Sequence, residues 1–429
     1  MKEHPVLGRL VLGYSPMIDR QRAVVATRMT VFPQPGEAVP DGAALLAALH
    51  EVWPADAVSG DIQPTLRPLD PGGAAARGLA AGAAAPTMAH PVSLNIAGEA
   101  LLRAVMESRP PPHLMIEVPA FMATDSAHTG TLRELRQAGS VLLIKGRPLV
   151  PVPPEVLACF SHSIVELGEE RRSGPASAPG VRQVSTVQAG TRTAADVEQA
   201  FQRGAVAALG WPFDDPAPKA GGRSTVATDI QVVLELIQGV DRELPVARLD
   251  AILKRDPTLA YRLLRYLNSP AFGLSAEISS FSHAIMMLGY QRLKRWLALL
   301  LASSSKSANA KPLLHAAVRR GLMLEALARS NGDEEMRGEM FFCGVFSLLD
   351  RMLQQPFGEL LSKVPVPERV RQTLLGGGGP YEPYLELVRA VEQESVFDIR
   401  ECTERLLLGP AEVNRALLVA MRGALQIDG

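Results

Sequence analysis

The stretch DPTLAYRLLRYLNSPAF, residues 256–272, decides the fold class of the second half of the chain. Asp256 can accept hydrogen bonds from the first free backbone N–H groups of a helix. Pro257 suits the first turn, because no N–H is needed there. Pro270 ends the pattern. The stretch therefore predicts a capped amphipathic helix that buries leucines at three-and-four spacing: Leu259, Leu263, Leu264 and Leu267.

Further helical patterns surround this stretch, and strand signals are almost absent after residue 225. Residues 229–240 place their apolar side chains on one helical face, at Ile230, Val233, Leu234 and Ile237. Similar patterns predict helices over residues 282–287, 291–303, 313–330, 341–354, 367–375, 384–394 and 399–407. We therefore expect residues 225–429 to form one all-α domain, which is an ordinary size for a domain.

The first half has a different pattern, in which short apolar runs alternate with helical segments. The apolar runs are residues 10–12, 92–96, 114–118 and 141–144, and the helical segments are 98–106, 131–137 and 194–203. This order predicts strand–helix units and a mainly parallel sheet. The sequence DDPAPKAGGRS at 214–224 interrupts it, as a linker does. We expect an α/β domain over residues 1–213 and a linker over 214–224.

Composition narrows the classes of function. The chain has 429 residues, with 44 Lys and Arg against 45 Asp and Glu. This balance gives no global positive field, so we expect neither nucleic acid nor a membrane as a direct partner. The three cysteines are far apart and form no CxxC pair, which argues against a disulfide scaffold. The longest apolar stretch, residues 296–302, is far shorter than the ~20 residues of a membrane-spanning helix. We therefore expect a cytoplasmic protein.

An ordered series of motifs runs through the second half and includes Asp256, Pro257, Leu263, Asn268, Ser269, Leu288 and Gly289. Over roughly residues 225–400, this series closely resembles the HDOD domain, the HD-related output domain of bacterial signalling proteins. That family is structurally related to HD-type metal phosphohydrolases. Where such an enzyme would read Gly-Leu-Leu-His-Asp, this chain has Gly344-Val345-Phe346-Ser347-Leu348. The resemblance therefore implies a binding or output module without a metal.

Four short motifs in the first half occur in the same order as the motifs of a second family. They are Tyr14-Ser15-Pro16-Met17-Ile18-Asp19-Arg20, Val92-Ser93-Leu94-Asn95-Ile96, Leu114-Met115-Ile116-Glu117-Val118 and Gly210-Trp211-Pro212-Phe213. This series resembles the EAL-type cyclic di-GMP phosphodiesterase barrel. The two resemblances together imply a degenerate EAL-type (β/α) barrel followed by an all-α HDOD domain.

EAL enzymes hold two divalent ions with carboxylates at the carboxyl ends of barrel strands. In this alignment only Asn95 and Glu117 stand at their expected places. Arg28 and Lys145 bring positive charge to positions where cations would bind, which argues against a two-metal site. We therefore expect no enzyme activity, no catalytic residue, no metal and no cofactor. The substituted positions are Arg28, Ile144, Lys145, Glu166, Ala189 and Arg192.

Two interpretations of Arg28, Asn95, Glu117 and Lys145 remain open. They are either hydrogen-bonding residues at strand ends, or the lining of a reshaped pocket that binds an anion or nucleotide without hydrolysis. The leading hypothesis for the whole chain is a bacterial signalling adaptor or output module that acts through a protein partner. The alternatives are a cyclic di-GMP receptor without turnover, and a phosphodiesterase with unusual ligands.

Overall fold

The chain divides into two compact units. The first comprises residues 1–215 and 389–425, and the second comprises residues 216–388 and 426–428. The structure is a computed structural model, and it describes residues 3–36, 39–53, 91–168, 184–215, 228–253, 255–256, 281–303, 309–328, 333–362, 364 and 366–428.

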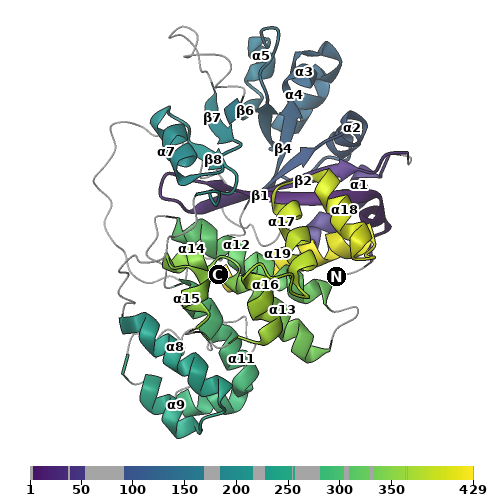
Figure 1. Cartoon of the computed structure of the whole chain (residues 1–429). Helices are drawn as coiled ribbons and strands as arrows, with labels where there is room; N and C mark the ends of the chain where they lie inside the picture. Colours follow the sequence, from purple (N-terminus) through teal and green to yellow (C-terminus); the bar gives the residue numbers. More distant parts are fainter. Residues whose placement is uncertain are drawn as a thin grey trace. The chain divides into compact units, whose positions relative to one another are not determined.

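The first unit contains a closed barrel of strands β1 to β8 (Figure 1). Strand β1 runs antiparallel to both of its neighbours, β2 and β8, whereas neighbouring strands from β2 to β8 run parallel. The α/β barrel predicted from the sequence is thus confirmed. The strands are β1 (Leu10–Ile18), β2 (Val24–Pro33), β3 (Val92–Ile96), β4 (Leu114–Pro119), β5 (Val141–Lys145), β6 (Phe160–Glu166), β7 (Ser185–Ala189) and β8 (Ala207–Leu209).

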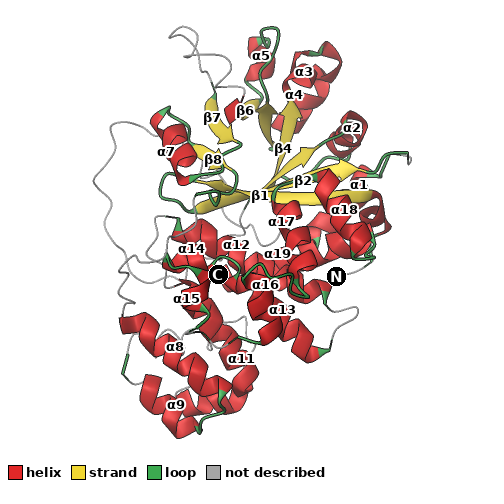
Figure 2. Ribbon diagram, in the orientation of Figure 1, coloured by secondary structure: helices red, strands yellow, loops and turns green. Residues whose placement is uncertain are grey.

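Helices surround these strands (Figure 2), so the strands are buried on both faces and β1 is buried along its whole length. One interior layer of the barrel is apolar and includes Met17, Met115, Leu143 and Ile164. The surrounding segments are η1 (Pro5–Arg9), α1 (Gly42–His50), α2 (Glu99–Glu107), α3 (Ala120–Thr124), η3 (Ser126–His128), α4 (Thr129–Gln137), α5 (Pro154–Leu157) and α7 (Ala194–Gln202).

Two helices near the end of the chain belong to the same unit as the barrel: α18 (Val396–Arg405) and most of α19 (Pro410–Asp428). This grouping differs from the predicted boundary, which placed residues 389–425 in the all-α domain. The physical reason includes the buried Asn414 side chain on α19. Its Nδ2 donates to the carbonyl oxygens of Leu7 and Leu10, both at 2.8 Å, and its Oδ1 accepts from the backbone N–H of Leu12 at 3.0 Å. These bonds tie the segment to the start of β1.

The described parts of the second unit are helical, which confirms its predicted all-α character. Helix α17 begins in this unit and ends in the first. The helices are α8 (Thr228–Asp241), α9 (Val246–Leu253), α11 (Phe281–Ser303), α12 (Ala310–Leu327), α13 (Glu334–Phe346), α14 (Leu349–Leu353), α15 (Phe357–Leu360), α16 (Glu368–Leu374) and α17 (Glu382–Glu392).

Two glycine features shape this helical unit. Gly289 has φ 71° and ψ 167° inside α11, so it separates the two helices that the sequence predicted at 282–287 and 291–303. Gly321 on α12 and Gly344 on α13 lie at a close helix crossing: a Cβ at Gly344 would lie 2.4 Å from the Gly321 nitrogen. Glycine is therefore required for the helices to approach this closely.

Within the described part of the chain, no helix combines the length and the apolar character needed to cross a membrane.

Candidate functional site

The four residues singled out at the barrel come from four neighbouring parallel strands. Arg28 lies on β2, Asn95 on β3, Glu117 on β4 and Lys145 on β5. The carboxyl ends of parallel barrel strands meet at one end of the barrel, so side chains near these ends converge. The contacts below show that the structure brings all four together.

Arg28 and Glu117 form a buried ion pair. The Arg28 Nη2 lies 2.7 Å from the Glu117 Oε2, and the two side chains are 7% and 0% exposed. The other Glu117 oxygen accepts a hydrogen bond from the Ser93 hydroxyl at 2.8 Å. Burial by itself lowers the pKa of Arg28, but the Glu117 and Glu394 carboxylates outweigh it and raise that pKa above its ordinary value. Arg28 therefore stays charged and holds Glu117.

Lys145 and Asn95 form a second contact beside this pair. The Lys145 ammonium donates to the Asn95 Oδ1, and the Asn95 Nδ2 donates to the Thr30 hydroxyl at 3.1 Å. Burial lowers the pKa of Lys145 below its ordinary value, the charge of Arg28 adds to this effect, and the carboxylates of Glu117, Glu394 and Glu166 oppose it. The Lys145 ammonium thus donates to an uncharged amide in a partly desolvated site.

Besides Ser93 and Thr30, two further residues that were not predicted from the sequence belong to this site. Glu394, between α17 and α18, places its Oε2 3.7 Å from the Arg28 Nη1, and its Oε1 accepts from the Ser15 hydroxyl at 2.7 Å. Ser15 lies in the opening motif of the barrel, so the motif itself indicates that Ser15 lies near this site. Glu394 gave no such signal, because it was read as the end of a helix in the all-α half.

These residues do not fit two divalent ions. The Arg28 guanidinium pairs with Glu117. Both Glu117 oxygens accept hydrogen bonds, one from Arg28 and one from Ser93. In the described residues, no three His, Cys, Asp or Glu side chains gather as a metal site would need. Of the other substituted positions, Arg192 lies at the exposed surface, 3.9 Å from Asp214. The site is an ionic network rather than a cage of carboxylates.

The second unit places its candidate residues differently. Asp256 and Gly289 are described, the side chain of Leu288 is not, and Pro257, Leu263, Asn268 and Ser269 lie outside the described residues. Ser347, at the His position of an HD enzyme, is buried and accepts from the Arg320 Nη1 at 3.0 Å. Asp350 is also buried, and burial raises its pKa above the ordinary value. A buried arginine thus approaches the place where an HD enzyme would carry a metal ligand.

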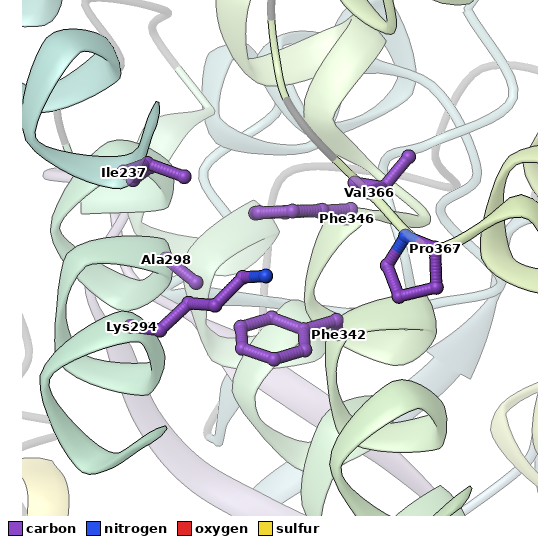
Figure 3. A pocket seen from close by; sticks show the side chains of 7 residues that line it. All are labelled: Ile237, Lys294, Ala298, Phe342, Phe346, Val366 and Pro367. Atoms are coloured by element: carbon purple, nitrogen blue, oxygen red, sulfur yellow. The ribbon is translucent and has the colours of Figure 1, made fainter. Parts of the chain in front are cut away.

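A small apolar pocket lies among the helices of the second unit (Figure 3). Its walls include Phe342, Phe346 and Pro367, and the Lys294 side chain runs along one side. The Lys294 ammonium pairs with Asp241 and lies 5.7 Å from the Phe342 ring centroid. The cavity volume is about 10 Å³, which is room for about one water molecule. This is below the roughly 300–1,000 Å³ of small-molecule sites, so we assign it no ligand.

Comparison with known proteins matches residues 226–355 to the HDOD domain. The chain is 31% identical over 207 residues to the uncharacterized protein YuxH of Bacillus subtilis, which covers 47% of this chain and 50% of that protein. It is 26% identical over 204 residues to the cyclic di-GMP phosphodiesterase CdgJ of Vibrio cholerae, which covers 47% of each. These matches span about half the length of both relatives.

A solved EAL domain, that of DcpA from Mycobacterium smegmatis, is 16% identical with a TM-score of 0.29 and covers 47% of this chain and 90% of that domain. The predicted resemblance to the EAL–HDOD proteins of cyclic di-GMP signalling is confirmed at the level of these matches. The HDOD match ends at residue 355, well before the end of the chain.

Proposed function

We propose that this chain is a non-catalytic component of bacterial cyclic di-GMP signalling, which acts as an adaptor or output module through a protein partner. The observation that carries the proposal is the buried Arg28–Glu117 ion pair. A two-metal phosphodiesterase needs free carboxylates at the ends of the strands to bind its ions. Here Arg28 pairs with the Glu117 carboxylate. A divalent ion beside Glu117 would be repelled by two positive side chains, Arg28 and Lys145.

The adaptor role draws support from the HDOD half. Ser347 and Leu348 stand where an HD-type metal hydrolase would carry its His-Asp pair. An HDOD domain without such a pair fits a role in binding. The partner is accordingly expected to be a protein that is recognised through helix surfaces.

A second candidate function is a receptor that binds cyclic di-GMP without turnover. The specific observation in its favour is Lys145, a partly buried cation whose ammonium donates to the uncharged Asn95 amide. A phosphate would be a stronger acceptor than this amide. The relative CdgJ is named a cyclic di-GMP phosphodiesterase, which suggests the nucleotide as the ligand to test first.

The test is incubation of the full chain with cyclic di-GMP and Mg²⁺ or Mn²⁺, followed by chromatography of the nucleotide. We expect intact nucleotide under all conditions. Metal-dependent linear product that Glu117→Ala abolishes would refute the proposal. Calorimetric titration of the same samples separates the two candidates, because a receptor gives saturable heat with intact nucleotide and an adaptor alone gives none.

A further inference from the structure

The carboxyl-terminal part of the first unit approaches the inside of the barrel closely. Gly13 lies on β1, two residues from Ser15 and therefore on the same face of the strand. A Cβ at Gly13 would lie 3.0 Å from the Glu394 Cα and 3.0 Å from the Val391 carbonyl oxygen. The backbone of residues 391–394 thus lies directly against the strand that carries Ser15.

Further contacts fix this segment at the barrel. The Trp211 Nε1 donates to the Glu392 carbonyl oxygen at 2.9 Å and to the Tyr14 carbonyl oxygen at 3.3 Å. The Tyr14 hydroxyl donates to the buried Glu392 carboxylate at 3.4 Å. Residues 389–395 are therefore held by hydrogen bonds from Tyr14, near the start of the barrel, and from Trp211, after its last strand. These bonds position Glu394 in addition to the ion pair that Glu394 makes itself.

The backbone at Glu394 adopts a conformation that normally favours glycine. Its φ is 54°, in the left-handed region, and the Ser395 N–H bonds back to the Ala390 carbonyl, as in a glycine-terminated helix end. A side chain in this conformation costs free energy relative to glycine. At Glu394 the side chain forms an ion pair with Arg28 and accepts a hydrogen bond from the Ser15 hydroxyl, and these contacts offset that cost.

We propose that residues 389–395 are a tethered occupant of the barrel: the Glu394 carboxylate holds the place beside Arg28 that the phosphate of a ligand would take. A phosphodiester ligand then binds the Arg28 and Lys145 side chains only by displacing Glu394. This inference rests on the proposed absence of a metal site, and it names the ligand class and the regulation of that same site.

The charges of the site explain why displacement is needed. Glu117 and Glu394 contact the Arg28 guanidinium, and the charges of Glu117, Glu394 and Glu166 all act on Lys145. With Glu394 in place, the carboxyl groups outnumber the cations and repel an incoming phosphate. Without Glu394, the numbers are equal and one face of the Arg28 guanidinium is open to an anion.

The experiment compares cyclic di-GMP binding by the full-length wild type and Glu394→Gly in calorimetric titrations with magnesium. Glycine suits the left-handed turn, so this variant removes the carboxylate without straining the fold. The matched control is Leu407→Gly, because Leu407 has the same φ of 54° and is 93% exposed. We expect Glu394→Gly to bind at least about tenfold more tightly than wild type, equivalent to about 1.4 kcal/mol, and Leu407→Gly to equal wild type.

A steric variant provides an independent test. Gly13→Ala keeps every charge but pushes residues 391–394 away from β1, so it should also increase affinity. Gly8→Ala is its control, since that Cβ would meet Ala411 at an ordinary 3.8 Å. Adding Lys145→Gln to Glu394→Gly should reverse the gain. Affinity of Glu394→Gly within twofold of wild type, or heat with neither protein, overturns the inference.

Chromatography of the titrated nucleotide separates this inference from the proposed function. Linear product in any sample refutes the non-catalytic proposal. Intact nucleotide with unchanged affinity refutes only the tethered occupant. Intact nucleotide with increased affinity in both Glu394→Gly and Gly13→Ala supports both.

Discussion

Replacing Arg28 with methionine should destabilise the barrel far more than a surface substitution of the same kind. At 2.7 Å and an effective dielectric constant of about 20, the attraction between Arg28 and Glu117 is roughly 6 kcal/mol. Desolvation of both groups offsets part of it. Removal of one partner from a buried pair leaves the other charge uncompensated, so Arg28→Met should lower the free energy of unfolding by about 3–5 kcal/mol. Glu117 would keep only the Ser93 hydroxyl.

The measurement is urea unfolding followed by tryptophan fluorescence. Trp296→Phe serves as the background, because the remaining tryptophans, Trp53 and Trp211, both belong to the first unit. The control is Arg103→Met. Arg103 pairs with Glu99 at 2.6 Å, but the two side chains are 52% and 48% exposed, so its loss should stay below about 0.5 kcal/mol.

The double variant Arg28→Met, Glu117→Met completes the test. Replacing both members of a buried pair removes both desolvation penalties, so the double variant should be more stable than Arg28→Met alone. A loss below about 1 kcal/mol for Arg28→Met would refute the reasoning. The reasoning would also be refuted if the double variant lost as much stability as Arg28→Met and Glu117→Met together, because additive losses mean that the two residues do not interact.

Three other substitutions test the packing and the pH response. Gly344→Ala should lower the free energy of unfolding of the second unit by about 1–3 kcal/mol, because its Cβ would collide with Gly321. Scanning calorimetry should show this as a lower melting temperature, and an unchanged melting temperature would contradict the close crossing. Burial lowers the pKa of His113, so the unfolded state binds more protons and stability falls as pH drops below about 6.5. Thermal melts of His113→Gln should therefore lose less between pH 7 and 5.5 than those of wild type. Asn414→Ala should cost about 1–3 kcal/mol by leaving buried backbone groups unpaired, and hydrogen exchange should speed up at Leu12; unchanged protection there would refute this role.

The barrel and the helical half were predictable because their apolar patterns are local. One strand that the apolar pattern did not indicate has polar residues in its interior. Strand β2 carries Thr27, Arg28 and Thr30 among its buried residues, which breaks the apolar run that signals a strand. The predicted helices end at residue 407 and do not include helix α19, although Pro410 after a glycine and the helical spacing of Val413 and Leu417 are signals for it.

Only some of the residues that form the site could be predicted from the sequence. The alignment to a known barrel placed Arg28, Asn95, Glu117 and Lys145 near one another, because parallel strand ends always meet. It gave no means of pairing Arg28 with Glu117 across 89 positions of sequence. Glu394 follows residues 216–388 of the helical unit in the chain, and it lies in the turn between two helices, α17 and α18. Periodicity carries no information about which unit a helix packs against.

The two surprises of the site, an arginine at a metal-ligand position and a glutamate from the end of the chain, follow from one electrostatic requirement. Arg28 and Lys145 bring two positive charges into a site shielded from water, and buried charges without partners cost several kcal/mol each. Glu117 neutralises one charge, and Glu394 supplies a further carboxylate on the other side of the same guanidinium. A barrel that binds metal ions needs its end open to exchange ions and substrate. A barrel that carries its own cations instead needs a built-in anion, and residues 389–395 deliver it. Under the proposed function, the absence of a two-metal site and the attachment of the carboxyl-terminal helices to the barrel are two parts of the same arrangement.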